Sequence, residues 1–321
     1  MTLISALGGG GGGEFDRIRE IVAALGNAVG GIGDDAALIP HGDGQLVVST
    51  DISVEGIHFR RAWLTPREIG WRATAAALSD MAAMGASATG VVVAITIPSD
   101  SDDDLATECM RGVGDAALAV GAKVIGGDLS GGAVLSLAVT VFGTAVRPVW
   151  RNGAAPGDQL WVTGALGGSR AGLLAFQGGG DVPAGARVAF AHPVPRIPAG
   201  IWLAAQGARA MLDLSDGLAG DAGHLAAASG VAVVIELAAL PIHPSVHRMA
   251  ASLGEPFSEF AAVGGEDYEL LVAMPAGWRP TQDPEAWTGT GLTRIGRVEA
   301  GEGVRLMQGG EVRALSGFRH V

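Results

Sequence analysis

A pattern of strands and helices that begins twice is the feature of this sequence that most constrains its fold. Short β-branched runs alternate with segments of helical periodicity up to Trp150, and a turn, "NGAAPGD", followed by a new strand, "QLWVTG", then starts the pattern again. The chain has 321 residues, 48% of them hydrophobic, which is enough to fill two cores. We therefore predict an α/β (α+β) architecture of two domains, residues 14–150 and 151–321, with mixed sheets flanked by helices.

The periodicity of each half assigns its elements. In the first half we expect helices over 14–25, from about Pro66 to Met84 and over 101–121, and strands over 45–51, 88–98, 123–128 and 133–146. In the second half we expect strands over 159–164, 231–237 and 268–274, a helix after Gly167, a strand that runs into a helix over 211–217, and a β-rich tail from Thr293. The glycine run before residue 14 has no side chains to bury, so residues 1–13 are expected to be a flexible leader.

Composition excludes several classes of function. The formal net charge is −12, whereas a general nucleic-acid binder needs a basic face, so no nucleic-acid partner is expected. The 21 basic residues comprise one lysine, Lys123, and twenty arginines, so the positive charge at a phosphate site would come from arginine or metal. Cys109 is the single cysteine, which excludes a disulfide framework. No apolar run reaches the length of a membrane span, and we expect a cytoplasmic protein that binds no membrane.

The loop "GGIGDDAALIP" combines glycine spacing with adjacent carboxylates. Gly31-x-Gly33-x-x-Ala36 has the spacing of a dinucleotide-binding turn, but a helix precedes it and a strand follows, which is the reverse of the context that such a turn requires. Asp34 and Asp35 would also repel a phosphate directly. Taken alone, the loop is more typical of an aspartate-rich turn than of a ligand site. The phosphate-binding pattern G-x-x-x-x-G-K-[ST] is absent as well.

Further aspartates change the interpretation of this loop. Four of them, Asp51, Asp128, Asp213 and Asp216, lie at or just beyond the C-terminal ends of predicted strands. Asp80 lies in an apolar helix, "ALSDMAAMGA", with no lysine or arginine three or four residues away to neutralise it. Magnesium ions would stabilise such carboxylates and would separate them from substrate phosphates. Two roles stay open for Asp34: it is either a second metal ligand or a residue that shapes the loop.

Seven motifs in order carry a resemblance to a known family. They are "GEFDRI" from Gly13, "GIGDDAAL" from Gly31, "STDISVEGIHF" from Ser49, "ALSDMAAMGA" from Ala77, "GGD" from Gly126, "DLSDGL" from Asp213 and "GGEDYEL" from Gly264. In order and spacing the chain closely resembles the thiamine-monophosphate kinase family from about residue 13 onward. The resemblance implies the fold of aminoimidazole ribonucleotide synthetase, a homodimer paired through the N-terminal sheets, and ATP bound near the domain junction. It also implies phosphorylation of thiamine monophosphate to thiamine diphosphate by ATP, with several Mg²⁺ ions.

The resemblance also assigns roles to individual residues. Matches to the family's metal ligands are Asp35, Ser49, Thr50, Asp51, Asp80, Asp128, Asp213 and Asp216. Matches to nucleotide contacts are Gly127, Asp128, Arg151 and Ser215, and matches to substrate contacts are His58, Glu266 and Phe318. Without the resemblance, His58 would be expected only to cap the end of its strand, and Glu266 to be a surface turn residue. Tyr268, Trp63 and Trp71 are expected to be packing residues.

The chemistry of this reaction is consistent with the residues. An acceptor phosphate is mostly deprotonated at neutral pH, so no general base is required, and the barrier is repulsion between two anions. We expect direct in-line transfer, with metal ions and Arg151 as charge stabilisers. Two related enzymes, selenophosphate synthetase and the hydrogenase-maturation dehydratase, need terminal cysteines or selenocysteine that do not match Cys109. A regulatory protein that binds ATP or thiamine phosphates without turnover remains an alternative.

Overall fold

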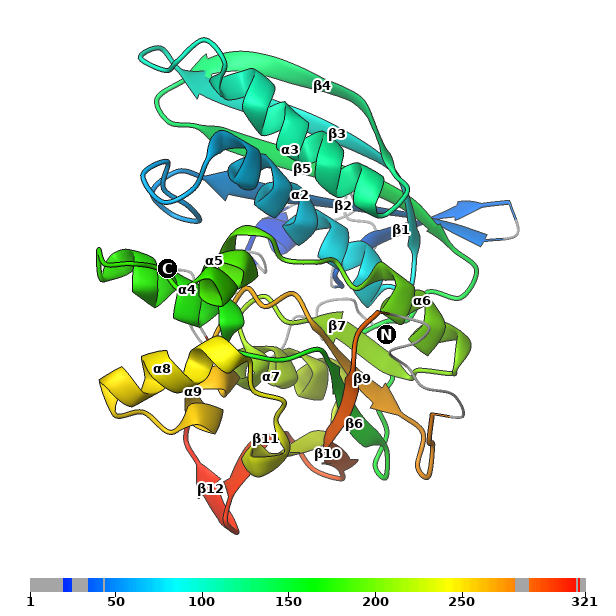
Figure 1. Ribbon diagram of the computed structural model, residues 1–321. Coiled ribbons are helices and arrows are strands. Elements are labelled where there is room, and N and C mark those ends of the chain that lie inside the picture. Colours follow the sequence, from blue (N-terminus) through cyan, green and yellow to red (C-terminus); the bar gives the residue numbers. More distant parts are fainter. Residues whose placement is uncertain (1–19, 25–33, 43, 281–288, 316, 318–321) are drawn as a thin grey trace.

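Two sheets, each from one half of the chain, form the framework of the protein. The computed structural model describes residues 20–24, 34–42, 44–280, 289–315 and 317. The first sheet has five strands in the order β1-β2-β5-β3-β4, and the second has seven in the order β12-β11-β8-β10-β6-β9-β7 (Figure 1). Most neighbouring strands are antiparallel, while β3 pairs with β4, and β11 with β8, in parallel. The predicted α/β class with mixed sheets flanked by helices is confirmed.

The first sheet is covered by two helices on one face. Its elements are β1 (Ala37–His41), β2 (Gly44–Val54), α2 (Pro66–Ala83), β3 (Ser87–Pro98), α3 (Leu105–Ala119), β4 (Lys123–Gly132) and β5 (Ser136–Ala145). Leu137, Val139 and Val141 alternate along β5 and are fully buried on the helix side, as a half-covered strand requires.

Helices α2 and α3 cross in close contact. Helix α2 begins with a capping box, in which Thr65 and Glu68 satisfy each other's backbone amides. At the crossing, a Cβ atom on Gly70 would lie 1.9 Å from the Cys109 carbonyl oxygen, and one on Gly112 would lie 1.9 Å from the Arg67 carbonyl oxygen. The two glycines therefore set the distance between the helices, because any side chain would separate them.

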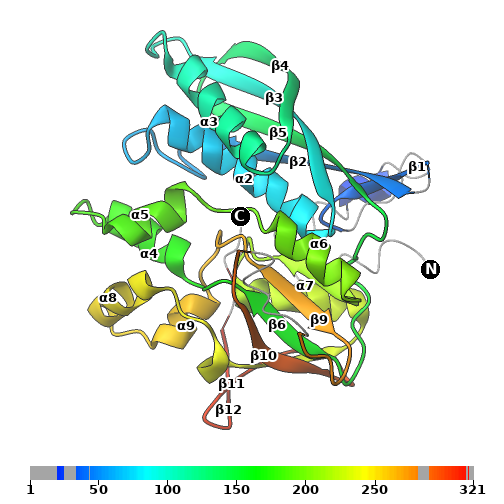
Figure 2. The same ribbon diagram turned by 45° about the vertical axis from the view of Figure 1, so that its right-hand side comes forward.

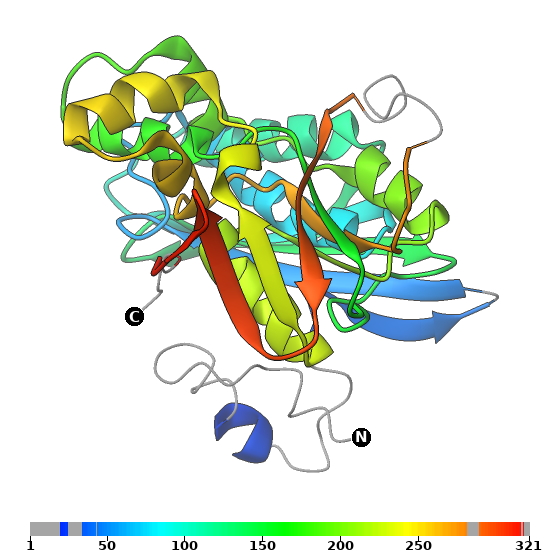
Figure 3. The same ribbon diagram turned by 90° about the horizontal axis from the view of Figure 1, so that it is seen from below.

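The second half wraps helices around the seven-stranded sheet. Its elements are β6 (Gln159–Thr163), α4 (Gly168–Gln177), α5 (Ala184–Ala191), α6 (Ile197–Ala205), β7 (Ala210–Asp213), α7 (Leu218–Ser229), β8 (Ala232–Glu236), α8 (Pro244–Leu253), α9 (Phe257–Ala262), β9 (Leu270–Met274), β10 (Leu292–Glu299), β11 (Gly303–Gln308) and β12 (Glu311–Arg313). Figure 3 shows β8 and β11 side by side, with α7 packed against them.

Helix α2 lies between the two halves (Figure 2). One side of it covers the first sheet, and it also contacts α5, α6 and β7 of the second half. Residues such as Leu78, Met81 and Met84 are completely buried there. A single core cluster accordingly runs from the first sheet through α2 to residues of β6 and β9. Side chains on α2 can therefore reach both halves of the molecule.

Several predicted boundaries are wrong. Strand β2 does not end at Asp51 but continues to Val54, since its ladder with β5 is unbroken from Gln45 to Val54. Strand β4 likewise continues past Asp128 to Gly132 through its parallel ladder with β3. Both aspartates thus lie within strands, because pairing with a long neighbour outweighs the low strand propensity of aspartate and glycine.

Other expectations fall partly outside the described residues. Of the helix expected over residues 14–25, residues 20–24 are described and are helical. The leader expected over residues 1–13 lies outside the described residues. Helices α5, α6 and α9 had no counterpart among the predicted elements. Within the part of the chain that the structure describes, no helix is long and apolar enough to cross a membrane.

Candidate active site

Three aspartates from distant parts of the sequence meet between the halves. Asp35 lies in the turn before β1, Asp80 on α2, and Asp213 at the end of β7. One carboxylate oxygen of each lies within 4.8 Å of the others. The Ser49 hydroxyl, on β2, lies 2.5 Å from Asp80 Oδ2 and 3.1 Å from the Asp35 carbonyl oxygen, and its one proton can be donated to either. Four of the residues predicted as metal ligands are thus brought together.

The electrostatics of this cluster favour a cation. Burial, together with the charges of Asp213 and Asp35, raises the pKa of Asp80 well above its ordinary value. Burial and the Asp35 charge raise the pKa of Asp213 to about 7. The pKa of Asp35 is raised by burial, and its Oδ2 atom is buried without a hydrogen-bond partner. Hard oxygen donors with an unsatisfied buried oxygen fit Mg²⁺.

Arg151 joins this cluster to the segment between the sheets. Its Nη2 atom forms an ion pair with Asp35 Oδ1 at 2.5 Å, and its Nε atom lies 3.4 Å from Asp34 Oδ1. Asp34 also accepts from the Arg151 backbone N–H at 3.0 Å and from the Asp35 backbone N–H at 2.9 Å. These contacts make Asp34 the residue that holds the turn against Arg151. They also show a partner for Arg151 that the sequence did not identify.

A second acidic group lies at the start of α7. Asp216, Asp221 and His224 offer ligand atoms within 4.8 Å of one another. Asp221 accepts from the Asp216 backbone N–H at 3.1 Å, and burial and the Asp216 charge raise its pKa well above the ordinary value. Burial and Arg151 lower the pKa of His224 to about 4, so its ring is neutral. Asp221 and His224 were not among the residues predicted from the sequence, although their spacing of three residues on a helix was a usable signal.

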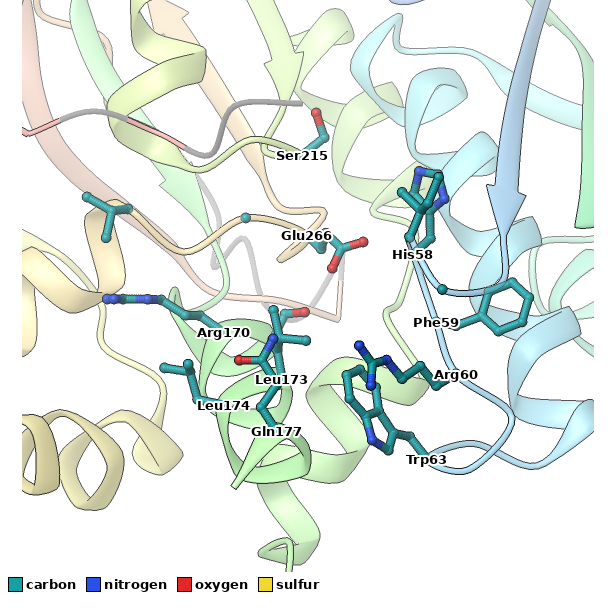
Figure 4. Close-up of a pocket in the computed structure, with 15 residues that line it drawn as sticks. His58, Phe59, Arg60, Trp63, Arg170, Leu173, Leu174, Gln177, Ser215 and Glu266 are labelled. Carbon is teal, nitrogen blue, oxygen red and sulfur yellow. The ribbon is translucent and has the colours of Figure 1, made fainter. Parts of the chain in front are cut away.

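A pocket of about 260 Å³ is lined by residues of both halves of the molecule (Figure 4). His58, Ser215 and Glu266, which were predicted as ligand contacts, all line it. Its other walls are residues 56–60 and Trp63, residues of α4, and Val263 and Gly265 just before Glu266. Ser215 lies two residues after Asp213, so the pocket and the carboxylate cluster share one loop.

His58 has a defined orientation in this pocket. Its Nδ1 atom accepts from the Val54 backbone N–H at 3.0 Å. A neutral imidazole that accepts at Nδ1 carries its proton on Nε2, so Nε2 is a hydrogen-bond donor. Trp63 was expected to be a packing residue, and it does stack on Phe176 with ring centroids 5.7 Å apart, but it also lines the pocket. This wall combines a polar donor with an aromatic surface.

The loop "GGEDY" that carries Glu266 has an unusual backbone. Glu266 has φ 62° and Tyr268 has φ 51°, a region that non-glycine residues rarely adopt. The Glu266 N–H donates to the Ser215 carbonyl oxygen at 2.7 Å. Asp267 accepts from the backbone N–H groups of Gly167 at 2.6 Å and Ser169 at 3.1 Å. The strained loop is therefore fixed from both sides, as is common at functional sites.

Of the remaining residues predicted from the sequence, those that the structure describes lie outside the cluster of Asp35, Asp80 and Asp213. Asp51 on β2 is near enough for its charge to raise the pKa of Asp80 and Asp213. Thr50 lies on the other face of β2, where its hydroxyl is 3.1 Å from that of Thr140. Asp128 belongs to neither carboxylate group. Phe318 lies outside the described residues.

Gly127 has a packing reason of its own. A Cβ atom at this position would lie 2.2 Å from the Val93 carbonyl oxygen, so a side chain would disrupt the pairing of β4 with β3. The glycine of the "GGD" motif is consequently explained within the protomer by the close approach of two strands, independently of any nucleotide contact.

Comparison with known proteins identifies the class. A family model of the AIR synthase related protein N-terminal domain matches residues 33–145, and the corresponding C-terminal domain model matches residues 155–308. The two halves of the chain thus belong to the AIR synthase related proteins, and the fold is that of this family.

Individual relatives narrow the identification. Thiamine-monophosphate kinase of Mycobacterium tuberculosis (strain CDC 1551 / Oshkosh) is 39% identical over 298 residues, which cover 86% of this chain and 90% of the relative. The enzyme of the same name from Aquifex aeolicus (strain VF5) is 35% identical, covering 91% and 93%. A solved structure described as AaThiL complexed with AMPPCP and TMP superposes with a TM-score of 0.87 at 32% identity, covering 96% and 97%. The chain belongs to the thiamine-monophosphate kinase family.

Proposed function

We propose that this protein transfers the γ-phosphoryl group of ATP directly to the phosphate of thiamine monophosphate, with Mg²⁺ ions, in the cytoplasm. The observation that carries the proposal is the cluster of Asp35, Asp80 and Asp213 together with the pocket of His58 and Glu266. The relatives named above, and the solved structure of a similar protein with AMPPCP and TMP, support ATP and thiamine monophosphate as the two substrates.

The proposed mechanism assigns a role to each group of residues. Asp35, Asp80, Asp213, Ser49 and Asp51 would hold the ions, with Asp216 as a further ligand near ATP. When bound, Mg²⁺ would neutralise the charge of the phosphates and orient them. The Nε2–H of His58 would bind the phosphate of the acceptor, and Ser215 would contact the nucleotide. No residue needs to remove a proton, since the acceptor phosphate is already ionised.

Arg151 has a defined place in this mechanism. Its guanidinium neutralises part of the charge of Asp34 and Asp35, and it has five N–H donors, so two contacts leave further donors for a phosphate. We propose that it holds Asp35 in place and stabilises charge on the transferred group. The N-terminal half, residues 14–150, would hold ATP and Mg²⁺, and residues 151–321 would complete the site.

We also propose a homodimer that completes the metal site. Asp128 lies on β4, the edge of the first sheet, and β5 and β3 separate it from β2, which places it about 14 Å from the row of Asp51 at ordinary strand spacing. The apolar side chains of Ile125 and Leu129 on β4 are more than 60% exposed. Among the described residues, Ser49–Val54 of β2 pair with β5 alone, since β1 pairs only with residues 44–48. The β4 strand of a second copy would cover this edge and bring Asp128 to Asp51.

The test of the activity is ADP release from the purified protein with ATP and Mg²⁺. Thiamine monophosphate, thiamine and an aminoimidazole-pathway substrate are added in separate reactions, and products are identified by chromatography. Thiamine diphosphate formed from the monophosphate is the expected result. ATP binding without turnover on any of the substrates would contradict the proposal and favour a regulatory protein.

The dimer has a separate test by subunit mixing. Asp51→Asn and Asp128→Asn should each lose most turnover with the fold intact. If Asp128 acts from the second copy, a heterodimer of the two variants has one intact site, and a randomly mixed population regains about a quarter of wild-type activity. If mixing restores no activity although subunit exchange is verified, both residues act within one protomer.

A further inference from the structure

Arg72, a residue of α2, makes a buried contact with the substrate loop of the other half. Its Nη2 atom lies 2.5 Å from Glu266 Oε1, and its side chain is 4% exposed. Its Nη1 atom donates to the Phe190 carbonyl oxygen on α5, and its guanidinium carbon lies 4.0 Å from the centre of the Phe190 ring. The guanidinium is thus fixed by three different groups.

Burying the charged guanidinium of Arg72 costs free energy that a neutral side chain in the same place would not, which indicates a role beyond packing. A buried arginine is unfavourable unless it is paired, and breaking such a pair leaves an uncompensated charge. Its partner is Glu266, whose backbone has φ 62° and which lines the pocket. The ion pair draws Oε1 of a carboxylate in a strained loop toward Arg72, and it does so by charge, since the Nη2–H bonds are not aligned with Oε1 for a hydrogen bond. Figure 4 shows the carboxylate of Glu266 directed into the pocket.

Helix α2 connects this contact to the carboxylate cluster. Arg72 and Asp80 are eight residues apart on α2, so their side chains leave the helix two turns apart along its axis and about 80° apart around it, within one broad face. Asp80 joins Asp35 and Asp213, while Arg72 reaches Glu266. One rigid element therefore positions groups at both ends of the site.

We infer that Arg72 is a positioning residue that fixes the Glu266 carboxylate for recognition of the acceptor substrate, an inference that rests on the proposed function. Because Arg72 and Glu266 together are neutral, the pair exerts little net attraction on a cationic ring. Recognition then depends on a directed hydrogen bond from a donor of the substrate to Glu266 Oε2. Arg72 thereby determines specificity for the acceptor and not for ATP.

The experiment measures KM and kcat for each substrate in Arg72→Lys and Arg72→Met. Lysine keeps the charge but has no planar fork to hold Glu266 and the Phe190 carbonyl together. We expect KM for thiamine monophosphate to rise about ten-fold or more, and KM for ATP to change less than about two-fold. Arg72→Lys should fold even where Arg72→Met does not, since it retains a paired cation.

A matched control is available in Arg187→Met. Arg187 on α5 also pairs with a glutamate of α2, Glu68, at 2.6 Å, donates to a backbone carbonyl and lies over a phenylalanine ring, Phe176. It does not line the pocket. Its replacement should lower the melting temperature while leaving the ratio of the two KM values as in the wild type.

A double-mutant cycle distinguishes positioning from general stability. Glu266→Gln should raise KM for thiamine monophosphate in the wild type but should add little in the Arg72→Lys background. Additive effects, or an equal rise of KM for ATP, would overturn the inference. Wild-type protein without turnover would instead refute the proposed function, and the same cycle would then be measured by calorimetric binding of thiamine monophosphate.

Discussion

Replacement of Asp213 by asparagine should stabilise the protein when no divalent metal ion is present. Asp213 is 6% exposed, and burial with the charge of Asp35 raises its pKa from 3.8 to about 7. A carboxyl whose folded pKa lies above its unfolded value stabilises the fold only while it is protonated. Its contribution is therefore complete below pH 3.8 and is lost as the pH rises to about 7.

The size of the effect follows from the two pKa values. Ionising this carboxyl in the folded protein costs about 4 kcal/mol above pH 7 and about 2 kcal/mol at pH 5, relative to an unperturbed group. Asparagine removes this penalty at both pH values. If the chain unfolds as one unit, 4 kcal/mol corresponds to a rise of about 6 °C in Tm.

The assay is thermal unfolding in a chelator at pH 5 and pH 8, followed by titration with Mg²⁺. Asp213→Asn should gain more at pH 8 than at pH 5, and excess Mg²⁺ should raise Tm of the wild type more than that of the variant. Asp158→Asn is the control, because Asp158 is equally buried but pairs with Arg209 at 2.9 Å, so its replacement should lower Tm. A lower Tm for metal-free Asp213→Asn at pH 8 would refute the reasoning.

Three further expectations concern other contacts. Asp34→Asn loses the charge that pairs with Arg151, so kcat for ADP release should fall about ten-fold while KM for the acceptor is retained; unchanged kcat would contradict the contact's importance. Gly112→Ala would force α2 and α3 apart and lower stability by about 1–3 kcal/mol in thermal unfolding, whereas Gly114→Ala, with open space at its Cβ, would not. Cys109 is fully buried and burial raises its pKa to about 12, so a thiol reagent at pH 8 should react only after unfolding; rapid labelling of the native protein would show local opening.

The sequence predicts the elements of the fold better than their ends. The alternation of strands and helices was sufficient for the class, and the apolar spacing of α2 placed Asp80 on a helix correctly. The ends of β2 and β4 were misplaced because strand length depends on the partner strand, and the pairing of β2 with β5 and of β4 with β3 is not encoded locally.

The site shows the same division between local and distant information. The aspartates could be predicted as site residues because a charge in an apolar helix or beside a strand is unusual in the sequence itself. Arg72 could not be singled out, since an arginine within a helix is ordinary, and only the fold brings it to Glu266, 194 positions later in the chain. Asp34 could not be assigned either, because its partner Arg151 is contributed by the segment between the sheets.

Arg151 lies between β5 and β6, on the segment that leads from one sheet to the other. It is bonded to the turn of Asp34 and Asp35, while Asp80 and Asp213 come from α2 and β7. A rotation of one half against the other must therefore either break these bonds or separate the three carboxylates. With Mg²⁺ bound to the three carboxylates as proposed, ion occupancy would be thermodynamically linked to the angle between the halves, and the free Mg²⁺ concentration should determine how narrow the distribution of interdomain angles is.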